Sequence, residues 1–441
     1  MRLFQGDGRC LVVRHRLPVR ASSVTCPMIR HVLLGLVLHT GVNAAPIPDA
    51  WPQWRGPTRD GISATGSWPD RLDEKVLQKR WRLELGPSYS GPIVTPDRVF
   101  TTETKDGKFE VVRALDRSTG REIWKAEWSG SMKVPFFARS NGDWIRSTPA
   151  WDGQNLFVGG MRDVLVCLDG TTGVEKWRHN FPEELKTEVP TFGFVCSPLV
   201  DGDALYVQAG GGVVRLDKES GKIRWRSMVD GGGMDGSAFS SPVLANLAGK
   251  RQLVVQSRTH LAGLDPEDGK ELWSTAVEAF RGMNILTPTI VSSNRIFTST
   301  YGGKTVAFDI SNSDGRFGAA PAWTFKAQGY MTSPILLNGH AYLHLRSQRA
   351  LCIDVATGTE KWTSSQGFGK YWSMVANKER ILALDERGIL FLIRANPEKF
   401  EVMAERKVAD DTWAHLAVAG DQLFIRELRA LAVYDWVKSA D

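Results

Sequence analysis

Aromatic and cationic residues recur along this chain just before short strand signals that open on a Pro after a small residue. Ser147-Thr148-Pro149, Ser197-Pro198 and Ser333-Pro334 are three of these signals. Aromatic rings beside Lys or Arg bind carboxylates, carbonyls and apolar groups, and both residue types are enriched at protein interfaces. We therefore predict a ligand- or partner-binding surface formed by Tyr89, Trp144, Arg146, Phe194, Phe239, Asn284, Tyr330, Lys370, Trp372, Trp413 and His415, with Phe192 and Tyr371 beside them.

Residues that could support catalysis or metal binding are fewer. A general base or a Ca²⁺ site requires carboxylates that converge. The candidates are Asp143, Asp235 and Asp410-Asp411. Their scattered positions are typical of polar loop residues, so we predict no catalytic residue and no metal site.

A repeated Asp-Gly-Trp unit indicates which elements position these residues. The first copy reads Leu115-Asp116-Arg117-Ser118-Thr119-Gly120-Arg121-Glu122-Ile123-Trp124. Each copy indicates a strand that ends in Asp, a turn that needs Gly in a left-handed conformation, and a strand with one large aromatic residue. The other copies are Asp169 with Gly173 and Trp177, Asp217 with Gly221 and Trp225, Asp265 with Gly269 and Trp273, Asp354 with Gly358 and Trp362, and a worn copy from Asp309 to Trp323.

The spacing of these units predicts the blades of a propeller. Their Trp residues recur at intervals of about 40 to 50 residues, which is the length of a four-stranded blade. Two more strand signals precede each unit, as at 147–150 and 156–159, joined by the Asp152-Gly153 turn. We predict an all-β, eight-bladed β-propeller of four-stranded antiparallel blades. The number falls to seven if one of the worn units is not a blade.

The two ends of the chain are expected to close this ring. The last unit, over 414–435, has no room for an outer strand, whereas Lys79-Arg80-Trp81-Arg82 looks like an outer strand with none before it. Pairing the N-terminal strand near Trp81 with the last blade would protect both sheet edges. We assign the propeller to 79–437 and a separate N-terminal segment to 45–78.

Composition argues against nucleic acid as a partner. The chain has 441 residues and a formal net charge of +6. Six Arg and a single Asp lie within residues 1–45, so the net charge of the remaining residues is close to zero.

The cysteines beyond the N-terminal segment do not have the spacing of metal ligands. We expect all three, Cys167, Cys196 and Cys352, to be small core residues.

The N-terminal residues contain a targeting signal that begins at Met28. Arg30 and His31 precede the apolar run 32–38, and Val42-Asn43-Ala44 forms a small-x-small cleavage site. We predict a signal peptide over 28–44 and export to the periplasm or beyond. Residues 1–27 are then a misassigned start or a disordered extension, and the mature chain carries no membrane span.

The Leu-Asp-x-x-Thr-Gly-x-x-x-Trp repeat resembles the repeat of pyrroloquinoline quinone (PQQ) propellers over about 51–436. In that family the outer-strand Trp of each blade stacks on the neighbouring blade. The resemblance therefore implies a blade-docking role for Trp81, Trp124, Trp177, Trp225, Trp273, Trp323 and Trp362. The opening segment, Trp51 to Ser63, resembles the start of a secreted, non-enzymatic branch comparable to outer-membrane protein assembly factor B, and it is also faintly similar to the entry segment of the family's dehydrogenases.

The same family also contains quinone-dependent alcohol and sugar dehydrogenases. These enzymes often hold PQQ against two adjacent Cys, with Ca²⁺ beside it, and this chain has no adjacent Cys pair. We therefore expect a non-catalytic, cofactor-free exported scaffold, monomeric, that binds protein or peptide partners of the cell envelope, or a small ligand, through its channel face. A PQQ- and calcium-dependent dehydrogenase is the alternative.

Two further alternatives stay open at this point. The aromatic residues ahead of the inner strands could fill the channel as core instead of forming a binding surface. The segment 133–139 is apolar and flanked by cations, and it either forms a contact site or folds back onto a blade.

Overall fold

Strand burial follows the position of each strand within its sheet. The middle strands are buried on both faces, as β7 (Asn155–Gly160) shows, whereas the outer strand β5 (Glu122–Ser129) alternates between exposed and buried side chains. This pattern is expected where sheets stack face to face and only their outer edges meet solvent. The computed structural model describes residues 49–64, 68–230, 232–234, 236 and 239–437, all within one compact unit.

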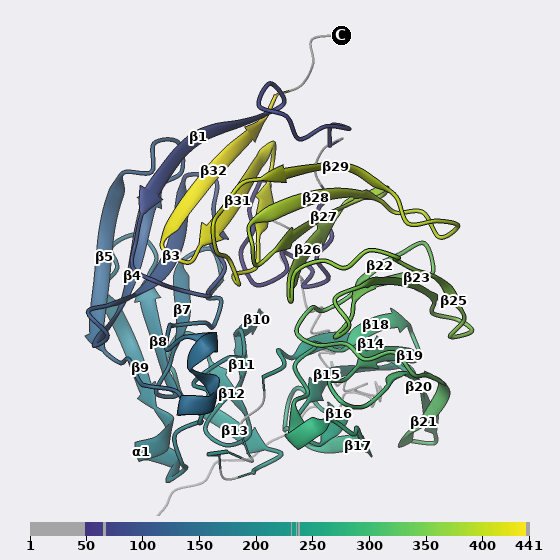
Figure 1. Ribbon diagram of the computed structural model, residues 1–441. Coiled ribbons are helices and arrows are strands. Elements are labelled where there is room, and N and C mark those ends of the chain that lie inside the picture. Colours follow the sequence, from purple (N-terminus) through teal and green to yellow (C-terminus); the bar gives the residue numbers. More distant parts are fainter. Residues whose placement is uncertain (1–48, 65–67, 231, 235, 237–238, 438–441) are drawn as a thin grey trace, which may run out of the picture. The chain divides into compact units, whose positions relative to one another are not determined.

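Eight four-stranded antiparallel sheets form the eight blades, which confirms the predicted propeller (Figure 1). The first four blades, in order from the inner to the outer strand, contain β2 (Ile93–Val94), β3 (Arg98–Lys105), β4 (Phe109–Asp116) and β5; β6 (Ala150–Trp151), β7, β8 (Val164–Asp169) and β9 (Glu175–Asn180); β10 (Leu199–Asp201), β11 (Ala204–Gln208), β12 (Val213–Asp217) and β13 (Ile223–Ser227); and β14 (Val243–Leu247), β15 (Lys250–Gln256), β16 (His260–Leu264) and β17 (Glu271–Ala276).

The remaining blades continue in the same order, and three short helices, α1 (Phe181–Leu185), η1 (Phe136–Asn141) and η2 (Phe280–Gly282), lie between blades. Blades 5 to 8 contain β18 (Thr289–Ser292), β19 (Arg295–Ser299), β20 (Thr305–Ser313) and β21 (Arg316–Phe325); β22 (Ile335–Leu337), β23 (His340–His344), β24 (Ala350–Asp354) and β25 (Glu360–Thr363); β26 (Trp372–Ala376), β27 (Arg380–Asp385), β28 (Ile389–Arg394) and β29 (Val402–Lys407); and β30 (Ala417–Ala419), β31 (Gln422–Glu427), β32 (Ala430–Trp436) and β1 (Leu77–Glu84).

The ring closes as the sequence predicts. Strand β1 pairs antiparallel with β32, and Trp81 lies opposite Val433. The buried side chain of Arg426 fixes the junction, because its Nη2 donates to the carbonyl oxygens of Gly86 at 2.6 Å and Thr102 at 3.0 Å in blade 1. Closure removes two exposed strand edges, which would otherwise be free to pair with other chains.

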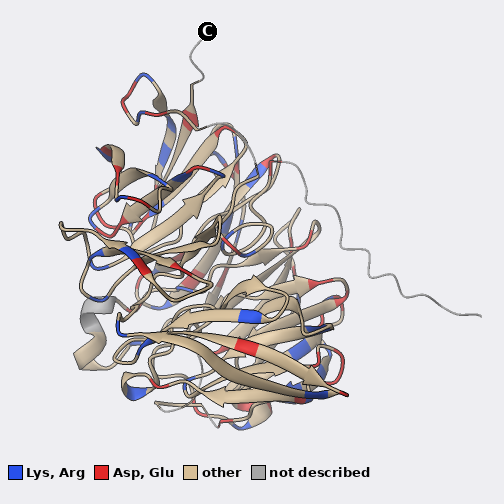
Figure 2. Ribbon diagram, turned by 90° about the vertical axis from the view of Figure 1, so that its right-hand side faces the viewer, with Lys and Arg blue, Asp and Glu red and all other residues tan. Residues whose placement is uncertain are grey.

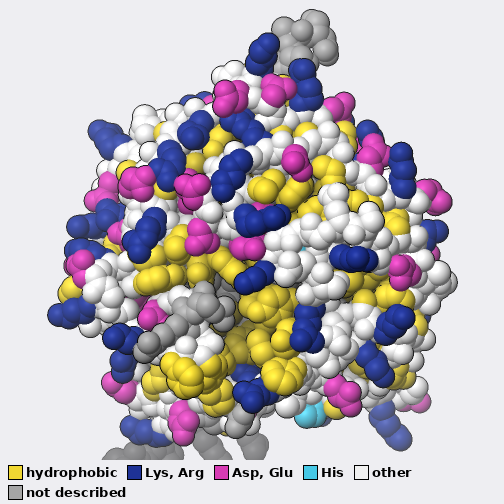
Figure 3. Space-filling view, in the orientation of Figure 1, with side chains coloured by type: hydrophobic (Ala, Val, Ile, Leu, Met, Phe, Trp, Pro, Cys, Tyr) yellow, Lys and Arg dark blue, Asp and Glu magenta, His cyan; other side chains and the backbone are white. Residues whose placement is uncertain are grey.

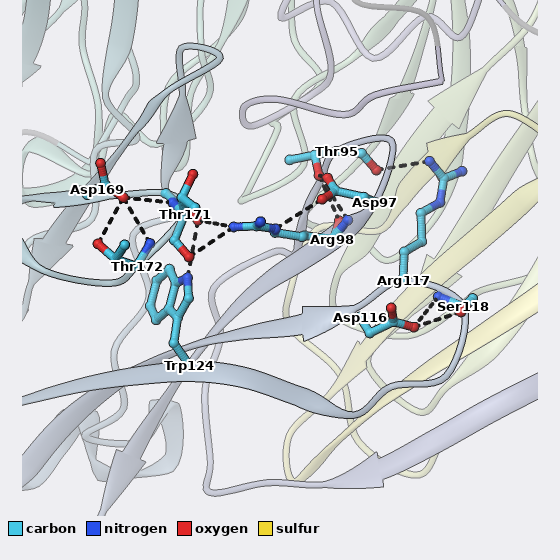
Figure 4. A network of polar contacts seen from close by, with 11 residues as sticks. Thr95, Asp97, Arg98, Asp116, Arg117, Ser118, Trp124, Asp169, Thr171 and Thr172 are labelled. Atoms are coloured by element: carbon cyan, nitrogen blue, oxygen red, sulfur yellow. Dashed lines mark hydrogen bonds and ion pairs between the residues drawn. The ribbon is translucent and has the colours of Figure 1, made fainter.

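Five of the six Asp-Gly-Trp units form a turn that receives the Trp of the preceding blade. Asp169 Oδ1 accepts hydrogen bonds from the backbone N–H groups of Thr171 and Thr172, which fixes the turn. Gly173 has a φ of +75°, and a Cβ there would lie 2.5 Å from the indole of Trp124. The indole Nε1 of Trp124 donates to the carbonyl oxygen of Gly170 at 3.1 Å (Figure 4).

The same contact recurs around the ring with one exception. Indole nitrogens reach turn carbonyls of the next blade from Trp81, Trp177, Trp225, Trp323 and Trp362. Trp273 Nε1 instead donates to Gln252 Oε1 in its own blade at 2.7 Å. In blade 5, β20 and β21 continue as a long hairpin up to Ser313 and Arg316, and the glycine of its turn, Gly315, has no heavy atom of a described Trp near it, so this turn does not receive Trp273.

Neighbouring blades share their apolar cores. One cluster joins Phe100 and Val112 of blade 1 to Leu156 and Val166 of blade 2. Seen from the side, Lys and Arg alternate with Asp and Glu over strands and turns (Figure 2). Among the residues described, no helix has the length and apolarity required to cross a membrane. The predicted signal peptide, 28–44, and the extension 1–27 lie outside the described residues.

Candidate functional site

The two faces of the propeller differ in what they carry. The inner strand of each blade begins at one face, which we call the loop face, where the connections between blades, α1, η1 and η2 also lie. The inner strands end at the opposite face, which we call the turn face, where the Asp-Gly-Trp turns lie. Figures 1 and 3 are seen from the loop face.

The segment Trp51–Ser63 fills the channel from the turn face, and we call it the plug. The Trp51 N–H donates to the carbonyl oxygen of Val94 at 2.8 Å, and the carbonyl oxygen of Pro52 accepts from the Trp151 N–H at 2.7 Å. On the far side of the channel, the Ser63 N–H donates to the carbonyl oxygen of Ala376 at 2.7 Å. These partners lie on the inner strands of blades 1, 2 and 7, so the plug crosses the channel.

Two buried arginines anchor the plug. Arg55 Nη2 donates to the carbonyl oxygen of Pro334 in blade 6 at 2.5 Å, and Arg59 donates to the carbonyl oxygens of Ser197 and Pro198 in blade 3. Both side chains are almost fully buried, and burial lowers the pKa of each guanidinium to about 10. Both therefore stay charged at neutral pH.

Trp54 lies between these cations. The guanidinium carbons of Arg55 and Arg59 lie 5.5 and 5.8 Å from its ring centroid, and the ring meets His415 edge-on at 5.8 Å. Burial and the neighbouring Arg55 charge lower the pKa of His415 to about 3, so this imidazole is neutral. His415, predicted as a surface residue, is instead covered by the plug.

A first aromatic group lies at the loop face of blades 1, 7 and 8. Tyr371 and Trp413 stack with their ring centroids 5.6 Å apart and an interplanar angle of 12°, and Tyr89 lies 6.1 Å from Trp413. Burial, partly offset by the charge of Arg55, raises the pKa of Tyr371. Arg146 lies beside these rings, where its Nε donates to the carbonyl oxygen of Trp144 at 3.2 Å and its Nη2 to that of Gly142 at 2.7 Å.

A second group extends outward from blades 2 to 4. Phe192 lies 5.6 Å from Phe239 and 6.4 Å from Phe137, and the guanidinium of Arg258 lies 4.7 Å from the Phe239 centroid. The exposed fractions of Phe136 and Phe137 are 81% and 54%. The segment 133–139 therefore presents its aromatic rings to solvent, although Val134 packs inward.

A third group lies over blades 5 and 6. Tyr301 contacts Tyr330 at 5.2 Å and Phe280 at 5.7 Å, and the guanidinium of Arg346 lies 4.5 Å from its centroid. Phe280 is 52% exposed. In Figure 3, apolar side chains gather at the middle of the loop face with Lys and Arg around them. Interface centres have this composition.

Besides His415, which lies against the plug, four predicted site residues do not join these groups. Phe194, Asn284 and Trp372 are almost fully buried. Trp372 packs against Phe368 at 4.5 Å, within the core of blades 6 and 7. Lys370 is exposed on the loop face, with no ring contact among the described residues.

The sequence interpretation missed the residues with the most distinctive environments. Arg55 and Arg59 lie in a segment without repeats, and Tyr301 and Arg346 lie between the second and third strands of their blades rather than before an inner strand. The sequence did contain one signal for the plug: Arg55 and Arg59 lie close together in a Trp-containing segment that does not follow the blade repeat.

The residues at the channel do not fit a quinone held with calcium. Tyr371 and Trp413 stack directly on each other at the mouth, which leaves no aromatic slot between them, and Cys167, Cys196 and Cys352 are separate, buried and unpaired. Within the described ranges, no group of three or more His, Cys, Asp or Glu could hold a metal ion. Asp143 instead accepts from the Val134 N–H, and Asp235 lies outside the described residues.

Comparison with known proteins matches the chain to the BamB family over more than half of its length and to a dehydrogenase over a shorter part. A family model described as outer membrane protein assembly factor BamB matches residues 108–364. The chain is 22% identical over 368 residues to BamB of Moranella endobia, covering 79% of this chain and 87% of the relative. A shorter match, 28% identical over 200 residues, covers 42% of this chain and 26% of the quinohemoprotein alcohol dehydrogenase of Comamonas testosteroni.

The solved structure of BamB from Moraxella catarrhalis has a similar fold. Its TM-score is 0.58 at 14% identity, and the match covers 82% of this chain and 100% of that chain. Identity at this level supports the shared propeller fold alone.

Proposed function

Since the chain belongs to the family of the outer membrane protein assembly factor BamB, we propose that it is a non-catalytic, protein-binding propeller of the cell envelope. In this proposal the chain is exported by its predicted leader, acts as a monomer and takes part in outer membrane protein assembly. Its partner docks on the loop face.

The observation that carries this proposal is the exposure of large aromatic side chains on one face. Phe136, Phe137 and Phe280 are 81%, 54% and 52% exposed, and all three lie in connections between blades. Exposed aromatic rings are costly in water and are enriched at interface centres. Arg258 and Arg281 stack on neighbouring rings, which adds the cationic component common at such centres.

The plug supports the choice of face. Because Trp51–Ser63 occupies the channel at the turn face, a partner that uses the channel mouth has to approach from the loop face. The aromatic groups around Trp413, Phe192 and Tyr301 surround that mouth. The dehydrogenase alternative has no such support, since the quinone does not fit here, and no catalytic step is proposed.

The proposal is tested by affinity capture of the full chain from envelope extracts. In the first variant Phe136 and Phe137 are replaced by Ser, and in the matched control Ile123 and Val174 are replaced by Ser. The control residues are 44% and 64% exposed but lie at the turn face. We expect the first variant to lose assembly-related envelope partners and the control to retain them. Equal capture by both variants would exclude the loop face as the docking surface.

A further inference from the structure

A cavity of about 540 Å³ lies at the loop face where blade 5 meets blade 6. We call it the blade 5–6 pocket. Its walls come from the end of β21 at Phe325, from the connection between β23 and β24 that contains Leu345 and Arg346, and from β25. Its volume is within the range of sites that hold small ligands or the side chains of a bound peptide.

The pocket has an apolar wall and a cationic wall. Phe325, Ala327 and Leu345 supply apolar surface, and Leu345 is only 6% exposed. Lys326 and Arg346 supply two positive charges, and both are exposed. A ligand that fits both walls carries a carboxylate next to an apolar group.

Arg346 is held in place by neighbouring residues. Its backbone N–H donates to the carbonyl oxygen of Gln328 at 2.8 Å, and its Nη1 donates to Gln328 Oε1 at 3.0 Å. Its guanidinium also stacks on Tyr301 at 4.5 Å. A planar guanidinium fixed in this way has its other N–H groups available for a carboxylate.

The described carboxylates do not neutralise this cationic wall. Neither Lys326 nor Arg346 has an ion pair with any Asp or Glu in the described part of the chain. The acid in the lining, Glu360, accepts a hydrogen bond from Thr363 Oγ1 at 2.6 Å through its Oε1. Both cations are therefore available to an external carboxylate.

We propose that the blade 5–6 pocket binds an acidic peptide segment of a protein partner, in which one carboxylate lies beside an apolar side chain. The carboxylate contacts Arg346 and Lys326, and the apolar side chain lies against Phe325 and Leu345. This inference rests on the proposed function, because Arg346 of the pocket stacks on Tyr301 of the Tyr301–Tyr330 group on the loop face. The inference goes beyond the proposed docking face because it specifies the chemical character of the partner segment that binds there.

The test uses two fluorescein-labelled decapeptides that differ at one position. One peptide contains Leu-Phe-Glu and the other contains Leu-Phe-Gln, each between Gly-Ser flanks. Binding of each peptide to the full chain is followed by fluorescence polarisation. We expect the Glu peptide to bind about tenfold more tightly than the Gln peptide, and added salt to reduce this preference. Arg346→Gln with Lys326→Gln should abolish the preference, whereas Lys378→Gln, at an exposed turn-face position, should leave it unchanged.

Equal affinity for the two peptides, or a preference that survives the Arg346→Gln and Lys326→Gln changes, would overturn the inference. The proposed function is judged separately by capture of partners with the Phe136 and Phe137 variant. If that capture depends on the two Phe while the peptide preference is absent, the pocket assignment is wrong and loop-face docking stands. If neither dependence is found, both proposals fall.

Discussion

Arg59 donates a hydrogen bond from its Nη1 to the carbonyl oxygen of Pro198 at 2.7 Å, although the two residues lie 139 positions apart. Through this contact the N-terminal plug is tied to the start of the inner strand of blade 3. Together with the bond from Arg55 to Pro334, it holds the plug inside the ring and makes the two ends of the channel different. The channel is therefore blocked at the turn face, and the large exposed aromatic side chains lie at the loop face.

The first prediction concerns this anchor. Arg59→Ala removes three hydrogen bonds, including the one to Gln53 Oε1, and leaves two buried carbonyl oxygens without their donor. Part of the loss is offset because a buried charge is removed as well. We expect the free energy of unfolding to fall by about 2–3 kcal/mol in urea titrations. Arg121→Ala, at an exposed turn, should change it by less than about 0.5 kcal/mol, and an equal effect of both would contradict the anchoring role.

The second prediction separates backbone strain from the contact with the Trp ring. Gly173→Ala places a Cβ 2.5 Å from the Trp124 ring at a φ of +75°, whereas Gly107→Ala has a φ of +59° and no heavy atom within 4 Å. We expect Gly107→Ala to cost about 1 kcal/mol, from the left-handed conformation alone, and Gly173→Ala to cost several kcal/mol. Thermal unfolding of both variants measures the difference. Equal costs would mean that the ring can move aside freely.

The third prediction concerns a buried carboxylate between blades 2 and 3. Asp163 Oδ2 accepts from the Gly210 N–H at 2.7 Å, and burial raises the pKa of this carboxyl to about 7 from 3.8. Since the folded state holds the proton more tightly, the contribution of Asp163 to stability is present below pH 4 and declines as the pH rises to about 7.

Asp163→Asn keeps an oxygen acceptor for Gly210 but cannot titrate. Relative to this variant, the wild type should lose up to about 4 kcal/mol of unfolding free energy between pH 4 and pH 7.5. Denaturant titrations at the two pH values give the comparison, with Asp106→Asn in an exposed turn as the control. If the gap between wild type and Asp163→Asn is the same at both pH values, the carboxyl is not buried as described.

The blade repeat could be predicted from the sequence because its determinants are local. Asp169, Gly173 and Trp177 lie within one turn and the strand after it, so the sequence contains the whole pattern. Ring closure was also predictable, because an unpaired strand near Trp81 and a last blade without an outer strand each require a partner. The exception at Trp273 depends on the shape of the next blade rather than on its own unit.

The candidate site was only partly predictable. Tyr89, Tyr330 and Trp413, which precede inner strands, lie at the loop face, but position before an inner strand does not say which way a side chain points. Trp372 and Phe194 turn into the blade cores, and His415 turns toward the plug. Arg59 pairs with backbone carbonyl oxygens, which leave no mark in the side-chain sequence. Such contacts become visible only once the ring is assembled.

The most direct test of loop-face docking is site-specific photocrosslinking in intact cells. A photoreactive phenylalanine analogue replaces Phe137 in one strain and Val174 in another, since these side chains are 54% and 64% exposed on opposite faces. We predict that the chain crosslinks at position 137 to a discrete envelope protein and yields no such adduct at position 174. Adducts formed at position 174 and absent at position 137 would contradict the account.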